Sequence, residues 1–308
     1  MTFTSPPYED ARLYLPLRFK VKGQAWVDWM IPRVVEMCRI TDGLVFVNAA
    51  GKVRQWKYSP VVEWLVADLT RHHGIVCGPS PYVFSRVGIA GSGSTHYHRR
   101  DWEPIYAFAF PDRLPLSWSD NTSMGHPPKW APGGAMSHHL SNGTRRNQWG
   151  GSEKSTGGGR GTDGVLRNPK PKPSHVFATK RSFAEKVEAG AKIHTKADAG
   201  GMREQAYLPP KLANPGNVIK CRVGGGHMGH PLAHDNEASF PEKLVEFFVR
   251  SFAKPDSEVL DPFCGSGTVG AVSLKTGRRF CGVDIRSGKG GIETATKRLS
   301  EVQTELFN

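Results

Sequence analysis

The sequence predicts an α/β protein in which a mixed, mostly parallel sheet is covered by helices on both faces and interrupted by a basic, glycine-rich insertion. Three observations carry this prediction. Short apolar strands alternate with amphipathic helices on both flanks of the chain. A glycine-rich turn joins a strand to a helix near the C-terminus. Residues 121–235 carry most of the excess charge and few apolar side chains.

The first flank, residues 1–120, reads as half of a catalytic domain. Apolar residues recur at near-helical spacing over 26–39, which predicts a helix whose Trp26 and Trp29 lie in the core, with a kink at Pro32. The run 44–47 predicts a buried strand, and 60–72 predicts a second helix that begins at Pro60. Residues 75–84 and 105–110 predict two further strands.

The insertion, residues 121–235, holds ten Lys and seven Arg against seven acidic residues, so it supplies +10 of the net charge of +13. It also holds 19 of the 35 glycines. Such a segment buries too little apolar surface to offset its chain entropy, so we expect it to be poorly structured until it binds a polyanion. Double-stranded DNA is the expected partner. The expected DNA-binding residues are Arg145, Arg146, Arg160, Arg167, Lys170 and Lys172.

The second flank, residues 236–308, reads as the other half of the catalytic domain. It predicts helices over 240–252, 268–275 and 292–306, and strands over 259–260 and 280–284. Only one helix follows the last strand, so we expect either that the sheet is one strand short at this edge or that another segment takes the place of this strand.

Composition excludes several classes of protein. The chain has 308 residues and five scattered cysteines without a C-x-x-C pair, which disfavours a disulfide framework and a zinc site, so no metal is expected. It has no run of 18 apolar residues and no basic-then-apolar leader, so we expect no membrane partner. These features predict a reduced, cytoplasmic protein.

The turn between the predicted strand 259–260 and helix 268–275 predicts a nucleoside site. Gly265, Gly267 and Gly270 fit the pattern G-x-G-x-x-G, and Asp284 follows 19 residues after Gly265 at the end of the next strand. In such a turn the glycines let the backbone approach the ligand, and the acidic residue accepts hydrogen bonds from ribose hydroxyls. The remaining turn residues expected at the ligand are Pro262, Phe263, Ser266 and Thr268.

Two features favour S-adenosylmethionine (AdoMet) over NAD in this site. Only 38 residues follow Gly270, too few for the further βα units of a dinucleotide fold. Asp261 precedes the glycines, and a carboxylate there suits the ammonium of a methionine moiety and repels a pyrophosphate. The rest of the sheet must then come from earlier in the chain, as in a circularly permuted fold.

The tetrapeptide Ser5-Pro6-Pro7-Tyr8 is the candidate catalytic motif. Its prolines fix a rigid loop at a strand end. The Ser5 hydroxyl and the Pro6 carbonyl can accept hydrogen bonds from an exocyclic amine and turn its lone pair toward a methyl donor, while Tyr8 stacks on a base taken out of the duplex. Orientation alone then supplies most of the catalysis.

With these motifs the chain resembles the DNA amino-methyltransferases of the β order, over about 190 residues of the two flanks. Asp261 to Thr268 match the family pattern Asp-Pro-Phe-x-Gly-Ser-Gly-Thr, and Ser5 to Tyr8 match the catalytic motif in the form typical of cytosine-N4 members. The resemblance implies that Phe240 and Pro241 line the AdoMet pocket, that 100–103 belong to the target pocket, and that the insertion is the target recognition domain. It also makes a homodimer an option.

Several alternatives stay open from the residues alone. Adenine N6 competes with cytosine N4, because the first residue of the tetrapeptide is the only discriminator. An RNA methyltransferase shares the amine chemistry. An inactive AdoMet fold that binds nucleic acid and a dinucleotide-dependent oxidoreductase are alternatives from other classes. Methylation of cytosine carbon 5 is rejected because it needs a thiolate nucleophile and the chain has no Pro-Cys dipeptide.

Overall fold

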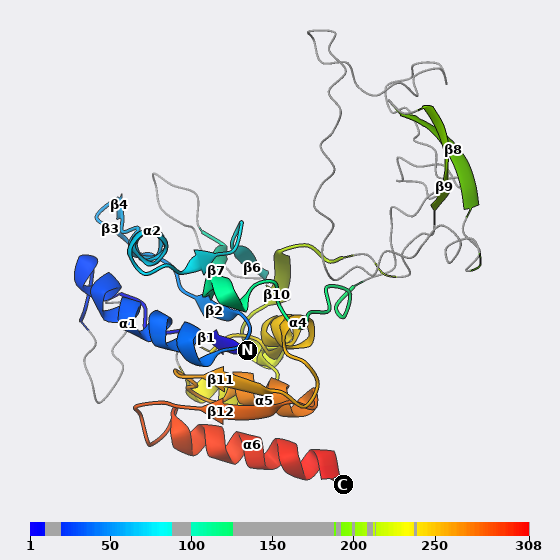
Figure 1. The fold of residues 1–308 in the computed structure, drawn as a ribbon. Helices are drawn as coiled ribbons and strands as arrows, with labels where there is room; N and C mark the ends of the chain where they lie inside the picture. The colour runs from blue at the N-terminus through cyan, green and yellow to red at the C-terminus, as the bar shows by residue number, and fades with distance from the viewer. Residues whose placement is uncertain are drawn as a thin grey trace. The chain divides into compact units, whose positions relative to one another are not determined.

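The computed structural model describes residues 1–9, 20–87, 100–125, 188, 192–198, 201–207, 212, 214–236 and 239–307 (Figure 1). The chain divides into two compact units. The first consists of residues 1–124 and 215–308, and the second of residues 125–214. The second unit is therefore shorter than the predicted insertion, because residues 215–235 belong with the sheet of the first.

The first unit is built on a mixed sheet with the strand order β10-β6-β7-β2-β1-β11-β12, in which β5 also pairs with β7. The pairs joining β2, β1, β11 and β12 are parallel, as is β10 with β6, while β7 runs antiparallel to its neighbours. The strands are β1 (Thr2–Thr4), β2 (Val45–Asn48), β5 (Val76–Cys77), β6 (Tyr82–Val87), β7 (Trp102–Ala109), β10 (Val218–Arg222), β11 (Glu258–Asp261) and β12 (Arg279–Gly282).

Helices cover both faces of this sheet, as β2 shows residue by residue. Side chains alternate between the faces of a strand. Val45 and Val47 pack with Trp26 in the cluster under the first two helices, while Phe46 packs with Phe248 in the cluster under the later ones. The helices are α1 (Gln24–Ile40), α2 (Val61–His72), α4 (Glu242–Phe252), α5 (Thr268–Lys275) and α6 (Ile292–Phe307). The predicted α/β class is confirmed.

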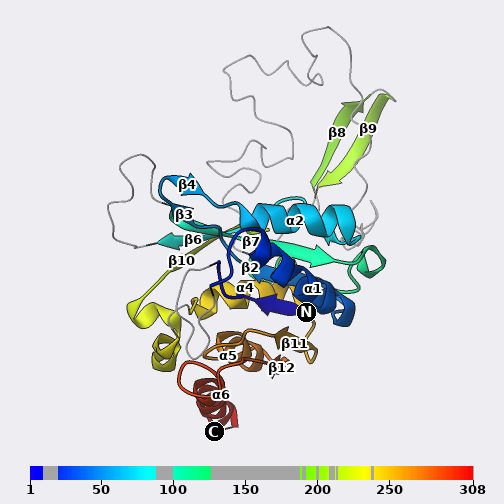
Figure 2. The same cartoon turned by 90° about the vertical axis from the view of Figure 1, so that its left-hand side faces the viewer.

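Strands from both ends of the chain pair with each other in the sheet. The N-terminal strand β1 lies between β2 and β11, with Thr2 paired to both Val45 and Leu260. The segments β11, α5, β12 and α6 lie next to one another near the C-terminus (Figure 2). In the described part of the chain the sheet ends at β12. Strand β1, which leads into the tetrapeptide 5–8, therefore lies beside β11, which leads into the glycine turn near the other end of the chain. This order of the strands along the chain is the predicted circular permutation.

Some elements differ from the prediction. The strand expected over 75–84 is two strands, β5 and β6, because Pro79 and Pro81 interrupt it and lack the N–H that a ladder needs. Strands β1 and β10 were not predicted. The hairpin of β3 (Val53–Arg54) and β4 (Lys57–Tyr58) was not predicted either, and short 3₁₀ turns occur at Pro111–Arg113, Gly225–Met228 and Pro231–Asp235.

The second unit contains an antiparallel hairpin of β8 (Lys192–Asp198) and β9 (Gly201–Tyr207). The expectation of a poorly structured insertion is therefore wrong for these residues. The sequence shows no apolar periodicity here, yet the two strands pair through their backbone hydrogen bonds.

Candidate active site

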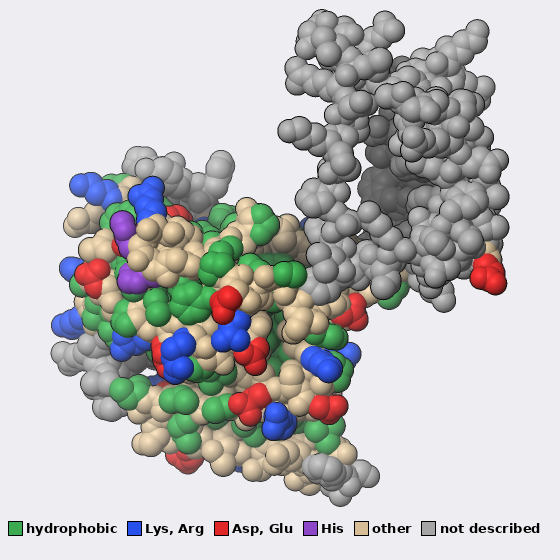
Figure 3. All heavy atoms as spheres, in the orientation of Figure 1, with side chains coloured by type: hydrophobic (Ala, Val, Ile, Leu, Met, Phe, Trp, Pro, Cys, Tyr) green, Lys and Arg blue, Asp and Glu red, His purple; other side chains and the backbone are tan. Residues whose placement is uncertain are grey.

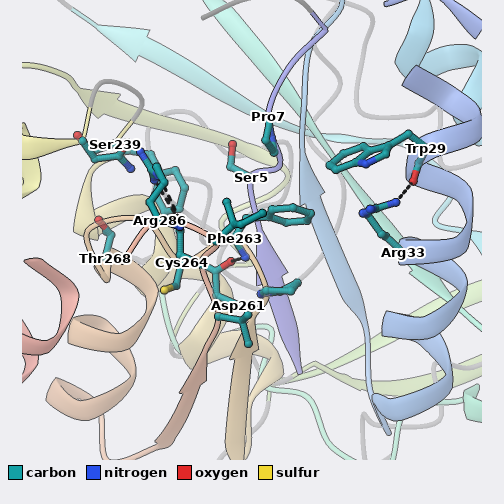
Figure 4. A pocket seen from close by; sticks show the side chains of 16 residues that line it. Ser5, Pro7, Trp29, Arg33, Ser239, Asp261, Phe263, Cys264, Thr268 and Arg286 are labelled. Atoms are coloured by element: carbon teal, nitrogen blue, oxygen red, sulfur yellow. Dashed lines mark hydrogen bonds and ion pairs between the residues drawn. The ribbon is translucent and has the colours of Figure 1, made fainter. Parts of the chain in front are cut away.

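A cavity of about 510 Å³ lies beside the ends of the neighbouring strands β1 and β11, whose following helices pack on opposite faces of the sheet. Strand β1 leads to α1 on one face, and β11 leads to α5 on the other, so a crevice opens between the carboxyl ends of two neighbouring parallel strands. Both predicted motifs follow these strand ends (Figure 4). The cavity is lined by Ser5, Pro7, Trp29, Arg33, Asn236, Ser239, Phe240, Asp261, Pro262, Phe263, Cys264, Thr268, Val283, Asp284, Ile285 and Arg286.

The glycine turn has the tight geometry that its sequence predicts. Gly265 and Gly267 have φ angles of +52° and +75°, in the left-handed region where a side chain is strained. A Cβ on Gly265 would lie 2.4 Å from the Asn236 amide nitrogen, and one on Gly270 would lie 2.6 Å from the Phe280 ring. The first two glycines therefore shape the turn, and the third lets α5 pack closely against β12.

Asp261 is a buried carboxyl group at the end of β11, only 2% exposed. Its Oδ1 accepts hydrogen bonds from the Thr4 hydroxyl at 2.6 Å and from the Phe263 N–H at 3.1 Å. Burial raises its pKa to about 7, and the nearby charge of Asp284 acts in the same direction. The two hydrogen bonds only partly offset this rise. Asp261 therefore changes charge near neutral pH, at the junction of β1 and β11.

Asp284, the predicted ribose acceptor, lies at the cavity wall just after β12 and is held from two sides. Its Oδ2 accepts from the Gly265 N–H at 2.9 Å, and its Oδ1 accepts from the Arg286 N–H at 2.8 Å. The Arg286 guanidinium also donates to both oxygens, at 3.0 and 3.2 Å. A carboxylate accepts about four hydrogen bonds in total, so these bonds fix the carboxylate's orientation and nearly fill its capacity.

The tetrapeptide is positioned by contacts from β2, α1 and β7. The Ser5 hydroxyl donates to the Asn48 carbonyl at 3.1 Å, and the Trp26 indole donates to the Pro7 carbonyl at 2.9 Å. The Tyr8 hydroxyl donates to Glu103 at 2.9 Å. Glu103 also forms an ion pair with Arg86 at 3.1 Å, so the group that accepts the Tyr8 hydrogen bond is itself held by a salt bridge.

The structure brings most predicted site residues to one place. Pro262, Phe263, Thr268 and Phe240 line the same cavity as Ser5, Pro7, Asp261 and Asp284. Ser266 is buried in the turn beside Gly265 and Gly267, Pro6 is buried in the tetrapeptide, and Pro241 is the buried N-cap of α4. The six basic residues expected to bind DNA, Arg145, Arg146, Arg160, Arg167, Lys170 and Lys172, lie outside the described residues.

Several cavity residues were missed. Trp29 was expected in the core but lines the cavity, where its ring lies 5.9 Å from that of Phe263 and carries the Arg33 guanidinium 3.9 Å above it. The i, i+4 spacing of Trp29 and Arg33 was an available signal. Val283 and Ile285 also line the cavity, on either side of Asp284, and are 54% and 77% exposed. Their position next to the predicted ligand residue was a second signal available in the sequence.

The cysteine in the turn is not a nucleophile. Cys264 is buried, and burial raises the pKa of its thiol to about 12. The thiol stays protonated at neutral pH, in agreement with the rejection of carbon-5 chemistry. Among the residues that the structure describes, no three His, Cys, Asp or Glu side chains form a group that could hold a metal ion. None of the described helices is long and apolar enough to cross a bilayer.

Comparison with solved structures defines the class of fold. The chain superposes on the structure of PvuII DNA methyltransferase (cytosine-N4-specific) with a TM-score of 0.52 at 14% identity, over 98% of this chain and 85% of that one. The chain thus has the fold of the AdoMet-dependent methyltransferases.

Sequence comparison shows which family part of the chain is similar to. Residues 162–289 match the DNA methylase family model N6_N4_Mtase. The type II methyltransferase M.Cfr9I of Citrobacter freundii is 34% identical over 142 residues, which cover 45% of this chain and 40% of that protein. M.HinfI of Haemophilus influenzae is 44% identical over 63 residues, or 20% and 17% of the two chains. Residues 162–289 are therefore similar to the DNA methylases of this family. The matched segments span less than half the length of these relatives.

Proposed function

We propose that the protein transfers a methyl group from AdoMet to the exocyclic amine of a base in double-stranded DNA, with cytosine N4 as the favoured target. The observation that carries the proposal is the shared cavity. Ser5 and Pro7 of the tetrapeptide line it together with Asp261, Phe263 and the other turn residues. A methyl donor bound at the turn would therefore face an amine bound at the tetrapeptide.

The cavity residues fit AdoMet. Gly265 and Gly267 give the turn a left-handed backbone that side chains would strain, and Phe263, Cys264 and Thr268 of this turn line the cavity. Asp261 offers a negative charge to the methionine ammonium, and Phe240, Val283 and Ile285 offer apolar surface to the adenine. When bound, AdoMet supplies an electrophilic methyl group on a sulfonium.

Asp284 is the proposed acceptor for ribose hydroxyls, but it already accepts bonds from Gly265 and Arg286. We expect Arg286 to release one carboxylate oxygen when the ribose binds. The Arg286 side chain would then remain beside the ribose and keep its contact with the other carboxylate oxygen of Asp284.

The proposed chemistry uses acceptors that the fold has prepared. The Ser5 proton is committed to the Asn48 carbonyl, so the Ser5 oxygen presents its remaining lone pairs as an acceptor for an amine N–H. The Trp26 indole engages the Pro7 carbonyl, which makes the Pro6 carbonyl the candidate second acceptor. Two such acceptors rotate the amine so that its lone pair faces the methyl donor. The nitrogen that gains the methyl group would displace a neutral thioether and then lose one proton to solvent.

Cytosine N4 is favoured over adenine N6 by the hydroxyl at the first tetrapeptide position. Ser5 offers an uncharged acceptor there, whereas adenine-N6 members more often carry Asp or Asn. We also propose that residues 121–235 contact the target DNA, since they carry +10 of the net charge. The cytoplasm, where DNA and reduced thiols coexist, is the proposed location.

Two measurements on the purified protein test this function. Calorimetry with AdoMet and with NAD should show binding of AdoMet alone. Transfer of isotope-labelled methyl groups from AdoMet to bacteriophage DNA should then be detected, and Ser5→Ala should slow it about 5- to 150-fold while AdoMet affinity is unchanged, as expected for about 1–3 kcal/mol from one orienting hydrogen bond. Binding of NAD, or AdoMet binding with no transfer to DNA, would contradict the proposal.

A further inference from the structure

The hairpin of β3 and β4 has a strained turn at its tip. The strands pair through Val53 with Tyr58, and the two turn residues Gln55 and Trp56 have φ angles of +44° and +65°. Two-residue turns of this shape favour Asn-Gly, because side chains without special chemistry are strained in the left-handed region. Here a glutamine and the largest side chain of all occupy both positions. Such strain is retained where the surrounding structure enforces it, and it marks candidate functional sites.

The base of the hairpin is firmly tied to the fold. Gly51 packs so closely that a Cβ there would lie 2.0 Å from the Ser59 carbonyl oxygen. The Ser59 N–H donates to the Lys52 carbonyl at 2.9 Å, and the Tyr58 hydroxyl donates to Glu63 at the start of α2 at 2.8 Å. The hairpin is thus closed at its base and bonded to α2, with Trp56 at its tip.

Aromatic and cationic side chains gather around this projection. Trp56, Tyr58 and Trp102 are 55%, 41% and 38% exposed. The Arg100 guanidinium lies 4.4 Å from the centre of the Trp102 ring and 5.7 Å from that of Tyr58. Lys57 adds a further cation beside the tip. Figure 3 shows Lys and Arg side chains over this part of the surface, near α2. We call the set Trp56, Lys57, Tyr58, Arg100 and Trp102 the aromatic ridge.

The aromatic ridge adjoins the tetrapeptide along the chain on two strands. Strand β2 ends at Asn48, whose carbonyl holds Ser5, and the hairpin starts five residues later. On β7, Trp102 precedes Glu103, which holds the Tyr8 hydroxyl. Two of the three contacts that position the tetrapeptide therefore come from residues that lead directly into the ridge.

We propose that the aromatic ridge binds DNA beside the target base, with Trp56 stacking on the bases exposed when the target leaves the duplex. This inference rests on the proposed function. Rings stack on any base, and each such contact is worth a measurable part of the affinity. Arg100 and Lys57 match the phosphate charge. A tip held in a hydrogen-bonded hairpin has less conformational entropy to lose on binding than an open loop, which suits a side chain that must enter a transient gap.

A duplex with one abasic position tests the ridge without knowledge of the recognition sequence, because it presents the gap in advance. Fluorescence anisotropy compares a labelled 30-base-pair duplex with the same duplex lacking one central base. The unsubstituted chain should bind the abasic duplex more tightly. Trp56→Ala should weaken that binding about tenfold and abolish the preference, while Trp56→Phe should retain most of it. The control Leu306→Ala, which truncates a side chain of α6 that is 51% exposed, should bind as the unsubstituted chain does.

Each other outcome is decisive. Equal affinities of Trp56→Ala and the unsubstituted chain for the abasic duplex would overturn the inference, as would an unsubstituted chain that binds neither duplex. A Trp56-dependent dimer in sedimentation, with DNA binding unaffected, would assign the ridge to a second copy instead. AdoMet calorimetry on Trp56→Ala confirms the fold. If Trp56-dependent DNA binding is found without any methyl transfer by the unsubstituted chain, the proposed function fails and the DNA-binding ridge stands.

Discussion

Replacing Asp261 with Asn should abolish a pH dependence of cofactor binding that the fold builds into the site. The carboxyl group is 2% exposed, and burial raises its pKa to about 7. A cationic ligand such as AdoMet favours the ionised form, so binding is coupled to loss of a proton. The affinity of the unsubstituted protein should therefore rise with pH through the neutral range.

The size of the effect follows from the fraction of Asp261 that is ionised. With a pKa of about 7, that fraction is about 9% at pH 6 and about 91% at pH 8, so the apparent affinity should rise about tenfold between them. Asp261→Asn carries no titrating group and should show a flat profile, with an affinity below that of the unsubstituted protein at pH 8. Its amide can still accept from Thr4, which helps the variant to fold.

Isothermal titration calorimetry with AdoMet at pH 6, 7 and 8, in two buffers of different ionisation enthalpy, measures both the affinity and the protons released. Asp112→Asn makes the same chemical change at a side chain that is 76% exposed, and it should keep the profile of the unsubstituted protein. Because the ligand's own titration is common to all three proteins, only the difference between them reports on Asp261. An unsubstituted protein with the same pH profile as Asp261→Asn would refute the reasoning.

Three further predictions follow from the same contacts. Without ligand, the free energy of unfolding should fall by on the order of 4 kcal/mol as the pH rises from about 4 to about 7. The reason is that Asp261 holds its proton more tightly in the folded protein than in the unfolded chain. Urea unfolding measures this fall, and Asp261→Asn should lack it. Tyr8→Ala should lower turnover far more than AdoMet affinity. Tyr8→Phe keeps the stacking ring and loses the bond to Glu103, so steady-state kinetics should show the milder loss for Phe. Equal losses would contradict a stacking role. Neutralising the basic residues of the insertion should lower DNA affinity for all sequences and leave AdoMet binding unchanged. The slope of log affinity against log salt concentration should flatten by up to about 0.9 per lost phosphate contact. An unchanged slope in filter binding would make the insertion a linker. The residues to neutralise are Arg145, Arg146, Arg160, Arg167, Lys170 and Lys172.

The sequence was most informative where local chemistry decides the structure. The helix over 268–275 was predicted with its observed bounds, because the glycine turn marks its start and Thr276-Gly277 its end. Asp261 and Asp284 were predicted to lie at one site, and they line the same cavity because strand ends in a parallel sheet meet at one edge. Helix 26–39 was predicted through Pro32, and the structure continues the helix across it.

The sequence was least informative where pairing partners are distant. Strand β1 is three residues long, too short for any periodicity, and it forms because Leu260 and Val45 offer ladders on both sides. Strand β10 alternates exposed and buried residues, but five residues amid glycines gave no usable signal. The bond from Arg286 to Asp284 could not be foreseen, since it depends on the turn after β12 bringing the guanidinium back to the carboxylate.

The most direct test of the central claim is mass spectrometry of nucleosides from the DNA of a methylation-deficient host that expresses the protein. N4-methylcytosine should be present with the unsubstituted protein and less abundant with Ser5→Ala, in line with its slower transfer. N6-methyladenine in its place would keep the amine chemistry and contradict the assignment to cytosine. DNA without any new methylated amine, from cells that hold folded protein able to bind AdoMet, would contradict the proposal that this cavity methylates DNA.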